Sequence, residues 1–181
     1  MMKKSEIAMR FLLAAALTVL CALPLFAQTT DSPSDNERLT TAAFDALKAG
    51  DFEAAIKKAG ECIKDFRREA ADVEKMLKDS KSTAPRVGPP KNDEEKQEVF
   101  SRGTLNDVAA CYFIQGEAHR KLADRATGKE KMDRLQNAKL AYETAAKFTY
   151  ARVWDTRGYF WDPAKTANNR IAEYLDPTRS P

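Results

Sequence analysis

Apolar residues recur at helical spacing along most of this chain. Leu39, Ala43 and Leu47 lie four residues apart, as they would on one face of a helix. The Gly-Asp pair at 50–51 then interrupts the pattern, as a helix end followed by a new N-cap would. A second stripe runs over 52–77, which is long enough for about seven helical turns. The pattern predicts a helical hairpin with a long second helix.

Helical periodicity returns after a proline-rich interruption. Residues 80–93 hold three prolines and a glycine, so we expect a loop there, and a loop of this length should be mobile or functional. Further helices are expected over 94–100, from Gly103-Thr104 to an end at Gly128, and over 135–148. A last helix should start at Asp162-Pro163, which suit the N-cap and first helical positions, and run to about Leu175. No alternating strand pattern is present, so the predicted fold class is all-α.

The first 27 residues have the organisation of a secretory signal peptide. Basic residues at its start precede an uncharged stretch at 11–27, and the chain turns polar directly after Ala27. An uncleaved anchor helix is an alternative, but the stretch has 17 residues and is short for a bilayer span. Lipidation at Cys21 is another, but Leu20 is a poor residue before a lipidated cysteine.

Cleavage after Ala27 would place the protein in the periplasm or outside the cell, with no membrane attachment. We expect a flexible leader at 28–36 and a single domain at 37–176. The full chain has a net charge of +3, from 30 basic and 27 acidic residues. Removing the signal segment lowers this to +1, because it holds three basic residues and one acidic residue. Such a balance gives no support for nucleic-acid binding.

Few residues of this chain suit metal or cofactor chemistry. His119 is the only histidine, and it lies on an apolar helix face where a packed core residue is expected. Cys62 and Cys111 are the two cysteines beyond the signal segment, and they also fall on predicted buried faces. They form either a disulfide, which an oxidising compartment would allow, or two buried free thiols. With no Cys-x-x-Cys spacing, neither a metal site nor a cofactor is expected.

Small residues recur where two antiparallel helices would touch. Ala43 and Ala55 are 12 residues apart across the first turn, and Gly116 and Ala138 are 22 apart across a later one. This pattern, with the Gly-Asp-Phe turn at 50–52, resembles a degenerate tetratricopeptide repeat. The second copy carries about ten extra residues, roughly at 124–133, and both copies lack the closing proline of the family. A generic helical bundle is the alternative.

The resemblance implies antiparallel helical hairpins stacked as a short tetratricopeptide-like array, closed by a C-terminal capping helix. The inner helices of such an array line a concave groove that binds peptides or partner helices. The groove residues implied here are Phe44, Leu47, Lys48, Phe113, Glu117, Arg120 and Lys121. An ordinary solvated helix face is the alternative for these positions.

A run of aromatic residues at 148–161 holds both tryptophans of the chain. It includes Tyr150, Trp154, Tyr159, Phe160 and Trp161, with arginines and an aspartate between them. One interpretation is a cap that covers the open end of the helical stack. The other is an aromatic platform for a glycan or a peptide, because rings beside arginine are common binding anchors.

No known catalytic or nucleotide-binding motif is present in the sequence. Asp51 and Glu53 suit a capping role at a helix N-terminus rather than acid–base catalysis. We therefore expect an exported, non-enzymatic scaffold or adaptor that presents a concave helical surface to a partner protein. The alternative is a carbohydrate- or cell-wall-binding module that uses the aromatic residues of 148–161.

Overall fold

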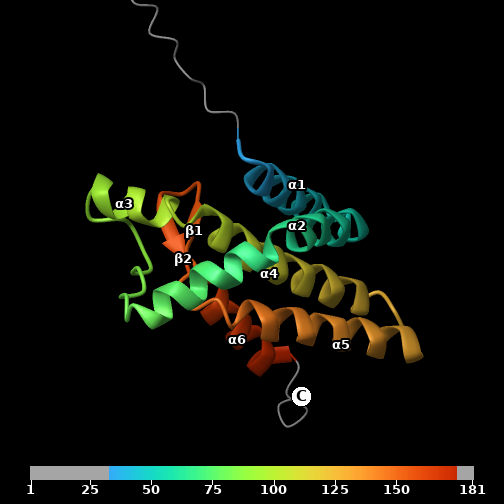
Figure 1. Ribbon diagram of the computed structural model, residues 1–181. Coiled ribbons are helices and arrows are strands. Elements are labelled where there is room, and N and C mark those ends of the chain that lie inside the picture. Colours follow the sequence, from blue (N-terminus) through green and yellow to red (C-terminus); the bar gives the residue numbers. More distant parts are fainter. Residues whose placement is uncertain (1–32, 175–181) are drawn as a thin grey trace, which may run out of the picture. The chain divides into compact units, whose positions relative to one another are not determined.

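The described part of the protein consists of six helices and one short β-hairpin. The computed structural model describes residues 33–174 (Figure 1), and the predicted signal peptide lies outside them. The elements are α1 Asp35–Ala49, α2 Phe52–Asp79, α3 Asp93–Phe100, α4 Gly103–Ala123, α5 Gly128–Ala145, β1 Val153–Asp155, β2 Tyr159–Trp161 and α6 Pro163–Tyr174. The predicted all-α class is confirmed. Helix α1 begins at Asp35, inside the stretch expected to be a flexible leader.

The first helical hairpin forms as its sequence predicts. Gly50 adopts a left-handed backbone with φ of 77°, a conformation that favours glycine, and its N–H donates to the Leu47 carbonyl. The Asp51 carboxylate accepts a hydrogen bond from the backbone N–H of Ala54 at 3.1 Å, which caps α2. This two-residue connection folds α1 back along α2, and the two helices are packed together.

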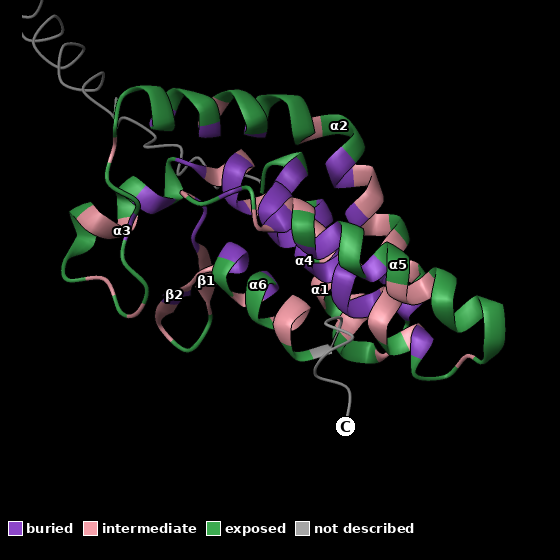
Figure 2. Ribbon diagram, turned by 90° about the horizontal axis from the view of Figure 1, so that it is seen from below, coloured by how far each residue is buried: buried purple, intermediate pink, exposed green. Residues whose placement is uncertain are grey.

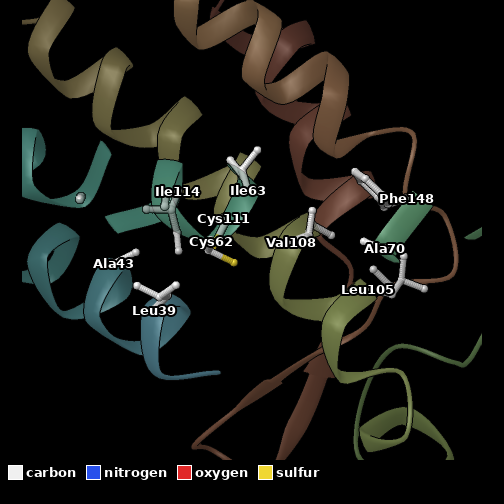
Figure 3. Packing of buried hydrophobic residues seen from close by; sticks show 14 of the residues in the cluster. Leu39, Ala43, Cys62, Ile63, Ala70, Leu105, Val108, Cys111, Ile114 and Phe148 are labelled. Carbon is white, nitrogen blue, oxygen red and sulfur yellow. The ribbon is translucent and has the colours of Figure 1, made fainter. Parts of the chain in front are cut away.

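Helix α4 is the centre of the structure, and most of its residues are buried (Figure 2). It packs on α1 and α2 on one side, on α5 on the other, and also contacts α6. Figure 3 shows the main cluster, in which side chains from α1, α2 and α4 meet. Its fully buried members are mostly small: Ala43, Ala55, Ala59, Cys62, Ala70, Ala109, Cys111 and Ala118. Small residues let helix backbones approach closely, so these helices are packed at short range.

Helices α4 and α5 meet at Gly116 and Tyr142. The Tyr142 side chain is fully buried, and its hydroxyl donates to Glu117 at 2.8 Å. A Cβ atom placed on Gly116 would lie 2.5 Å from two carbons of the Tyr142 ring. The ring therefore occupies the space that any larger residue at 116 would need.

Helix α5 begins earlier than the apolar pattern indicates. The sequence predicts about ten extra turn residues at 124–133, but α5 starts at Gly128 and only 124–127 connect it to α4. Its first turns are exposed and charged, with an ion pair between Lys129 and Asp133 at 2.5 Å. Because these turns bury no apolar stripe, periodicity could not reveal them. The extra residues lengthen the helix rather than the loop.

The sequence predicts no strands, and this prediction is wrong, because the chain after α5 forms a short β-hairpin. Strands β1 and β2 pair antiparallel, with Trp154 opposite Phe160 and Val153 opposite Trp161. Three residues per strand are too few to give a visible alternation. Gly88 of the proline-rich loop joins the same ladder, because its N–H and carbonyl both bond to Phe160 at 2.9 Å. The loop therefore has a defined partner, and with α3 it lies beside the β-hairpin (Figure 1).

Replacing Gly116 with alanine should destabilise the protein. The added methyl group would collide with the Tyr142 ring, which its hydroxyl bond and full burial hold in place. Alanine favours a helix over glycine, so overpacking is partly offset, and we expect a net loss of about 1–3 kcal/mol. Urea unfolding followed by circular dichroism measures it.

Gly60→Ala is the matched control. Gly60 also lies inside a helix, but its Cβ would meet only the amide nitrogen of Gln115 at 3.3 Å, at the end of a flexible side chain. This variant should be as stable as the unmodified protein or more so. Equal destabilisation by the two substitutions would contradict the role given to Tyr142.

Candidate functional site

Three aromatic rings from distant parts of the sequence meet beside α4. The Trp161 ring centroid lies 5.2 Å from that of Phe113 on α4 and 6.4 Å from that of Phe44 on α1, both in edge-on contact. We call Phe44, Phe113 and Trp161 the inner aromatic cluster. Edge-on pairs of this kind are favourable beyond the area they bury. Trp161 belongs to one predicted site and the two phenylalanines to another, and the structure brings the three rings together.

Each ring is held by the element that carries it. Phe44 follows the buried Ala43 on α1, and Phe113 is buried on α4 against Tyr142 of α5. Trp161 ends β2, two residues before α6 begins at Pro163. Because α6 packs on α4 and α5, it fixes the tryptophan near α4. Phe44 and Trp161 remain partly exposed, so the cluster keeps an accessible face.

The charged groups next to this cluster are occupied by neighbouring helices. Glu117 accepts hydrogen bonds from Tyr142 of α5 at 2.8 Å, from Arg170 of α6 at 2.7 Å and from Arg120 on its own helix at 3.1 Å. Burial alone would raise the pKa of Glu117, but the bonds from Tyr142 and Arg120 outweigh it and lower that pKa. Glu117 is therefore a buried carboxylate that ties α4 to α5 and α6.

The other residues predicted to line a groove differ in how exposed they are. Arg120 is largely buried and pairs with Glu117 and Asp124. Lys48 and Lys121 are exposed, and they lie further along α1 and α4 from the two phenylalanines. Leu47 is partly buried and packs against the main cluster, so Lys48 and Lys121 are the most accessible of the residues predicted to face a partner.

A second group of rings lies on the other face of the β-hairpin. Trp154 and Phe160 are cross-strand partners with centroids 5.0 Å apart, and Phe100 of α3 contacts each at 5.9 Å. The Lys96 ammonium lies over the Trp154 ring at 4.8 Å. We call Phe100, Trp154 and Phe160 the outer aromatic cluster. Phe160 is buried, whereas 41% of Phe100 is exposed.

The two other aromatic residues proposed for a ligand platform lie apart from these groups. Tyr150 packs against the main core, and Tyr159 lies in the hairpin with Arg157 over its ring at 5.0 Å. Phe160 and Trp161 belong to different clusters because successive side chains of a strand point to opposite faces. Phe100 and Lys96 are not among the residues that the sequence indicates for this site. Their short helix follows a proline-rich loop, and only its pairing with the hairpin gives these two residues a role.

A buried arginine holds the C-terminal segment in place. Arg152 donates to the carbonyls of Pro85 at 2.6 Å, Thr149 at 3.2 Å and Ala151 at 2.6 Å, and pairs with Asp162 at 3.2 Å. Asp162 also caps α6 as predicted, because its other oxygen accepts from the Lys165 N–H at 2.9 Å. One side chain thus joins the proline-rich loop, the segment before β1 and the start of α6.

Glu74 gives the same segment a second anchor. This buried carboxylate of α2 accepts from the backbone N–H of Thr149 at 2.9 Å and of Tyr150 at 3.2 Å. It also pairs with Lys78 at 3.1 Å. Charge-assisted bonds to backbone N–H groups are among the stronger hydrogen bonds in proteins. The chain after α5 is therefore attached to the long second helix as well as to α4.

A side-chain hydrogen bond attaches the start of helix α1 to α4. Asn36 donates to the Asp107 carboxylate at 2.6 Å. Burial raises the pKa of Asp107 to about 6, although the bond from Asn36 lowers it, and nearby Glu37 adds a further rise. This contact helps to set the position of α1, and hence of Phe44, relative to α4.

His119 lines a shallow pocket of about 390 Å³ between α4 and α5, together with Tyr112, Gln115 and Leu140. Its Nδ1 atom is buried and has no hydrogen-bond partner among the described residues. Burial lowers the pKa of His119, so the side chain is neutral at pH 7. A half-buried neutral histidine agrees with the packing role expected from the sequence.

Cys62 and Cys111 are both free and fully buried, and they lie beside each other in the main core (Figure 3). Within residues 33–174 no group of three acidic, histidine or cysteine side chains is placed to hold a metal ion. None of the described helices is long and apolar enough to cross a membrane. No family model, curated protein or solved structure matches this chain. The fold and site define a helical protein with two clusters of aromatic residues, each of which is partly exposed.

Replacing Arg152 with methionine should strongly destabilise the protein. Methionine fills similar space but leaves three backbone carbonyls and the Asp162 carboxylate without their donor. Removing one partner of a buried charge network costs about 3–5 kcal/mol. Thermal unfolding would measure the loss.

Arg157→Met is the control for that experiment. Arg157 is exposed in the same segment and pairs with Asp155 at 2.9 Å. Exposed ion pairs contribute little, so this variant should unfold close to the unmodified protein. An Arg152→Met protein as stable as Arg157→Met would refute the anchoring role.

The unfolding free energy should depend on the protonation of Asp107. Its pKa is about 6 in the folded state against an ordinary value of 3.8, so the folded state holds its proton to higher pH than the unfolded chain does. Stability should therefore fall as pH rises through about 4 to 6, by on the order of 1–3 kcal/mol. Asp107→Asn keeps an oxygen for Asn36 but cannot ionise, so it should remove this fall.

Denaturant unfolding at several pH values checks that expectation. Asp45→Asn on the exposed side of α1 is the control, and it should follow the unmodified protein at every pH. If Asp107→Asn shows the same decline between pH 4 and 7 as the unmodified protein, the decline arises elsewhere.

Proposed function

We propose that this chain is an exported, non-enzymatic adaptor that binds a segment of a partner protein on its inner helical face. The observation that supports partner binding most directly is the inner aromatic cluster, in which partly exposed Phe44 and Trp161 contact each other and Trp161 contacts buried Phe113. Aromatic anchors around a central contact are typical of interface hot spots. Export is supported by the signal-peptide pattern of the first 27 residues.

The packing order supports a tetratricopeptide-like arrangement. Helix α4 packs against both members of the α1–α2 hairpin, and α6 packs against both members of the α4–α5 hairpin. Stacking of each new helix on the preceding pair is how helical repeats bury a continuous core. Under this proposal α1, α4 and α6 are the inner helices, and α6 is the capping helix.

The chemistry of the surface favours a particular kind of segment. Phe44 and Trp161 offer apolar area, and two exposed basic residues lie on the helices of the phenylalanines: Lys48 one turn after Phe44 on α1, and Lys121 two turns after Phe113 on α4. Glu117 is buried and bonded to three donors, so it adds little negative field for a ligand. The partner segment should therefore carry an apolar anchor residue with acidic residues near it.

No catalytic role is needed for the acidic residues singled out in the sequence. Asp51 caps α2, and Glu53 pairs with Arg134 of α5 at 2.6 Å. Both contacts belong to the packing of the two hairpins. The proposal therefore assigns these groups to structure.

Phe44→Ala should weaken partner binding by about 30-fold or more, because loss of a hot-spot anchor costs 2 kcal/mol or above. The partner is first captured with a photo-crosslinking residue at Lys48, and its affinity for the purified chain is then measured by calorimetry. Leu140→Ala is the matched control, because Leu140 is an apolar side chain on α5 that is 60% exposed. Equal affinities of the two variants, both confirmed as folded, would reject the inner face as the binding surface.

A carbohydrate- or cell-wall-binding module is the second candidate, and the exposed edge of Phe100 in the outer aromatic cluster favours it. Lys96 already covers a face of Trp154, which reduces the area open to a sugar ring. The Trp154→Phe variant separates the candidates, since Trp161 is then the only tryptophan. Partner peptide should still change its emission. A response to oligosaccharides in the unmodified protein that Trp154→Phe abolishes would favour the second candidate.

A further inference from the structure

The two buried cysteines meet where the first hairpin packs on α4. Cys62 comes from α2 and Cys111 from α4, and each has no exposed surface. The Thr40 hydroxyl of α1 lies 3.2 Å from the Cys111 sulfur and 3.6 Å from the Cys62 sulfur. Three helices thus contribute one polar atom each to a single point of the core.

The thiols interact with each other as well as with Thr40. A hydrogen bond from Cys111 lowers the pKa of Cys62, and the same bond with burial raises the pKa of Cys111. Because both sulfur atoms lie within hydrogen-bonding distance of the same Thr40 hydroxyl, they are neighbours in the core. The described residues place no histidine or third ligand here that would make the pair a metal site. Two adjacent thiols without a metal have one reaction that joins them, which is oxidation to a disulfide.

We propose that Cys62 and Cys111 form an intramolecular disulfide when the protein folds in the presence of a small-molecule or protein disulfide. The bond would join α2 to α4 across the joint between the two hairpins. Both thiols are inaccessible in the folded state, so the first step belongs to the folding chain. The proposal does not depend on which partner or ligand the inner face binds.

The chemistry is thiol–disulfide exchange. The thiolate of one cysteine, having lost its proton to solvent, attacks a sulfur of the donor disulfide and releases one donor thiolate. Folding then brings the second cysteine to the mixed disulfide, where its thiolate displaces the other donor thiolate. The released thiolates take up the two protons. The cysteine pair loses two electrons and the donor disulfide gains them, so two thiols of the donor are produced.

The position of the bond predicts a large effect on stability. The two cysteines are 49 residues apart in the sequence, and closing a loop of this length restricts the unfolded chain considerably. For a protein of this size we expect the melting temperature to rise by roughly 10 °C in the oxidised form.

The test uses the full chain with Cys21→Ser, so that Cys62 and Cys111 are its only thiols. One sample is refolded from denaturant with a mixture of reduced and oxidised glutathione, and another with dithiothreitol. The oxidised sample should lose two hydrogens in mass, give no thiol titration when denatured, and yield a peptide that links Cys62 to Cys111. Its melting temperature should return to the lower value after unfolding and refolding with dithiothreitol.

Cys62→Ala and Cys111→Ala are the controls, and neither should show a melting temperature that depends on the redox buffer. Two titratable thiols after oxidative refolding, a glutathione adduct that persists in the folded protein, or only intermolecular dimers would overturn the proposal. If an alanine variant does not fold, the mass and peptide map of the Cys21→Ser protein decide the question alone. A missing disulfide would leave the proposed adaptor function untouched, since its test measures affinity at Phe44.

Discussion

Helix α4 lies close to its neighbours because small residues line the faces where they meet, and the remaining structure depends on that closeness. On one side, buried alanines and cysteines lie at the contacts of α4 with α1 and α2. On the other, Gly116 leaves room for the Tyr142 ring, whose hydroxyl then reaches Glu117. A wider spacing would break these polar contacts and open cavities, both of which are costly. The joint at Cys62 and Cys111 is a product of the same close packing.

The close packing also determines which side chains remain available at the surface. Glu117 has the residue type and position expected of a groove contact, but it is bonded to α5 and α6. A buried carboxylate with three donors stabilises the helix stack and has little capacity left for a ligand. The proposed inner face therefore offers a partner the partly exposed rings of Phe44 and Trp161 and the exposed side chains of Lys48 and Lys121. The proposed partner chemistry follows from this distribution.

The chain after α5 is held by contacts with distant residues, which the local sequence pattern does not predict. Arg152 reaches the proline-rich loop and the start of α6, and Glu74 of α2 binds two backbone N–H groups of the same segment. The partners of Arg152 and Glu74 are separated from them by up to 76 residues. Together with the Gly88–Phe160 pairing, these contacts hold the proline-rich loop, the β-hairpin and the start of α6 in one defined arrangement.

The sequence by itself determined the helices that bury an apolar stripe, together with the Gly50 and Asp162 signals at their ends, because periodicity and capping act within a few residues. It also indicated the small-residue contacts, since Ala43, Ala55 and Gly116 are spaced as packed helices require. Only the tertiary structure decided that α5 starts at Gly128, that the hairpin forms and that Trp161 joins Phe44 and Phe113. Those features depend on contacts between residues far apart in the chain. Such contacts stabilise the fold only after the packing of α4 against its neighbours has brought these residues together.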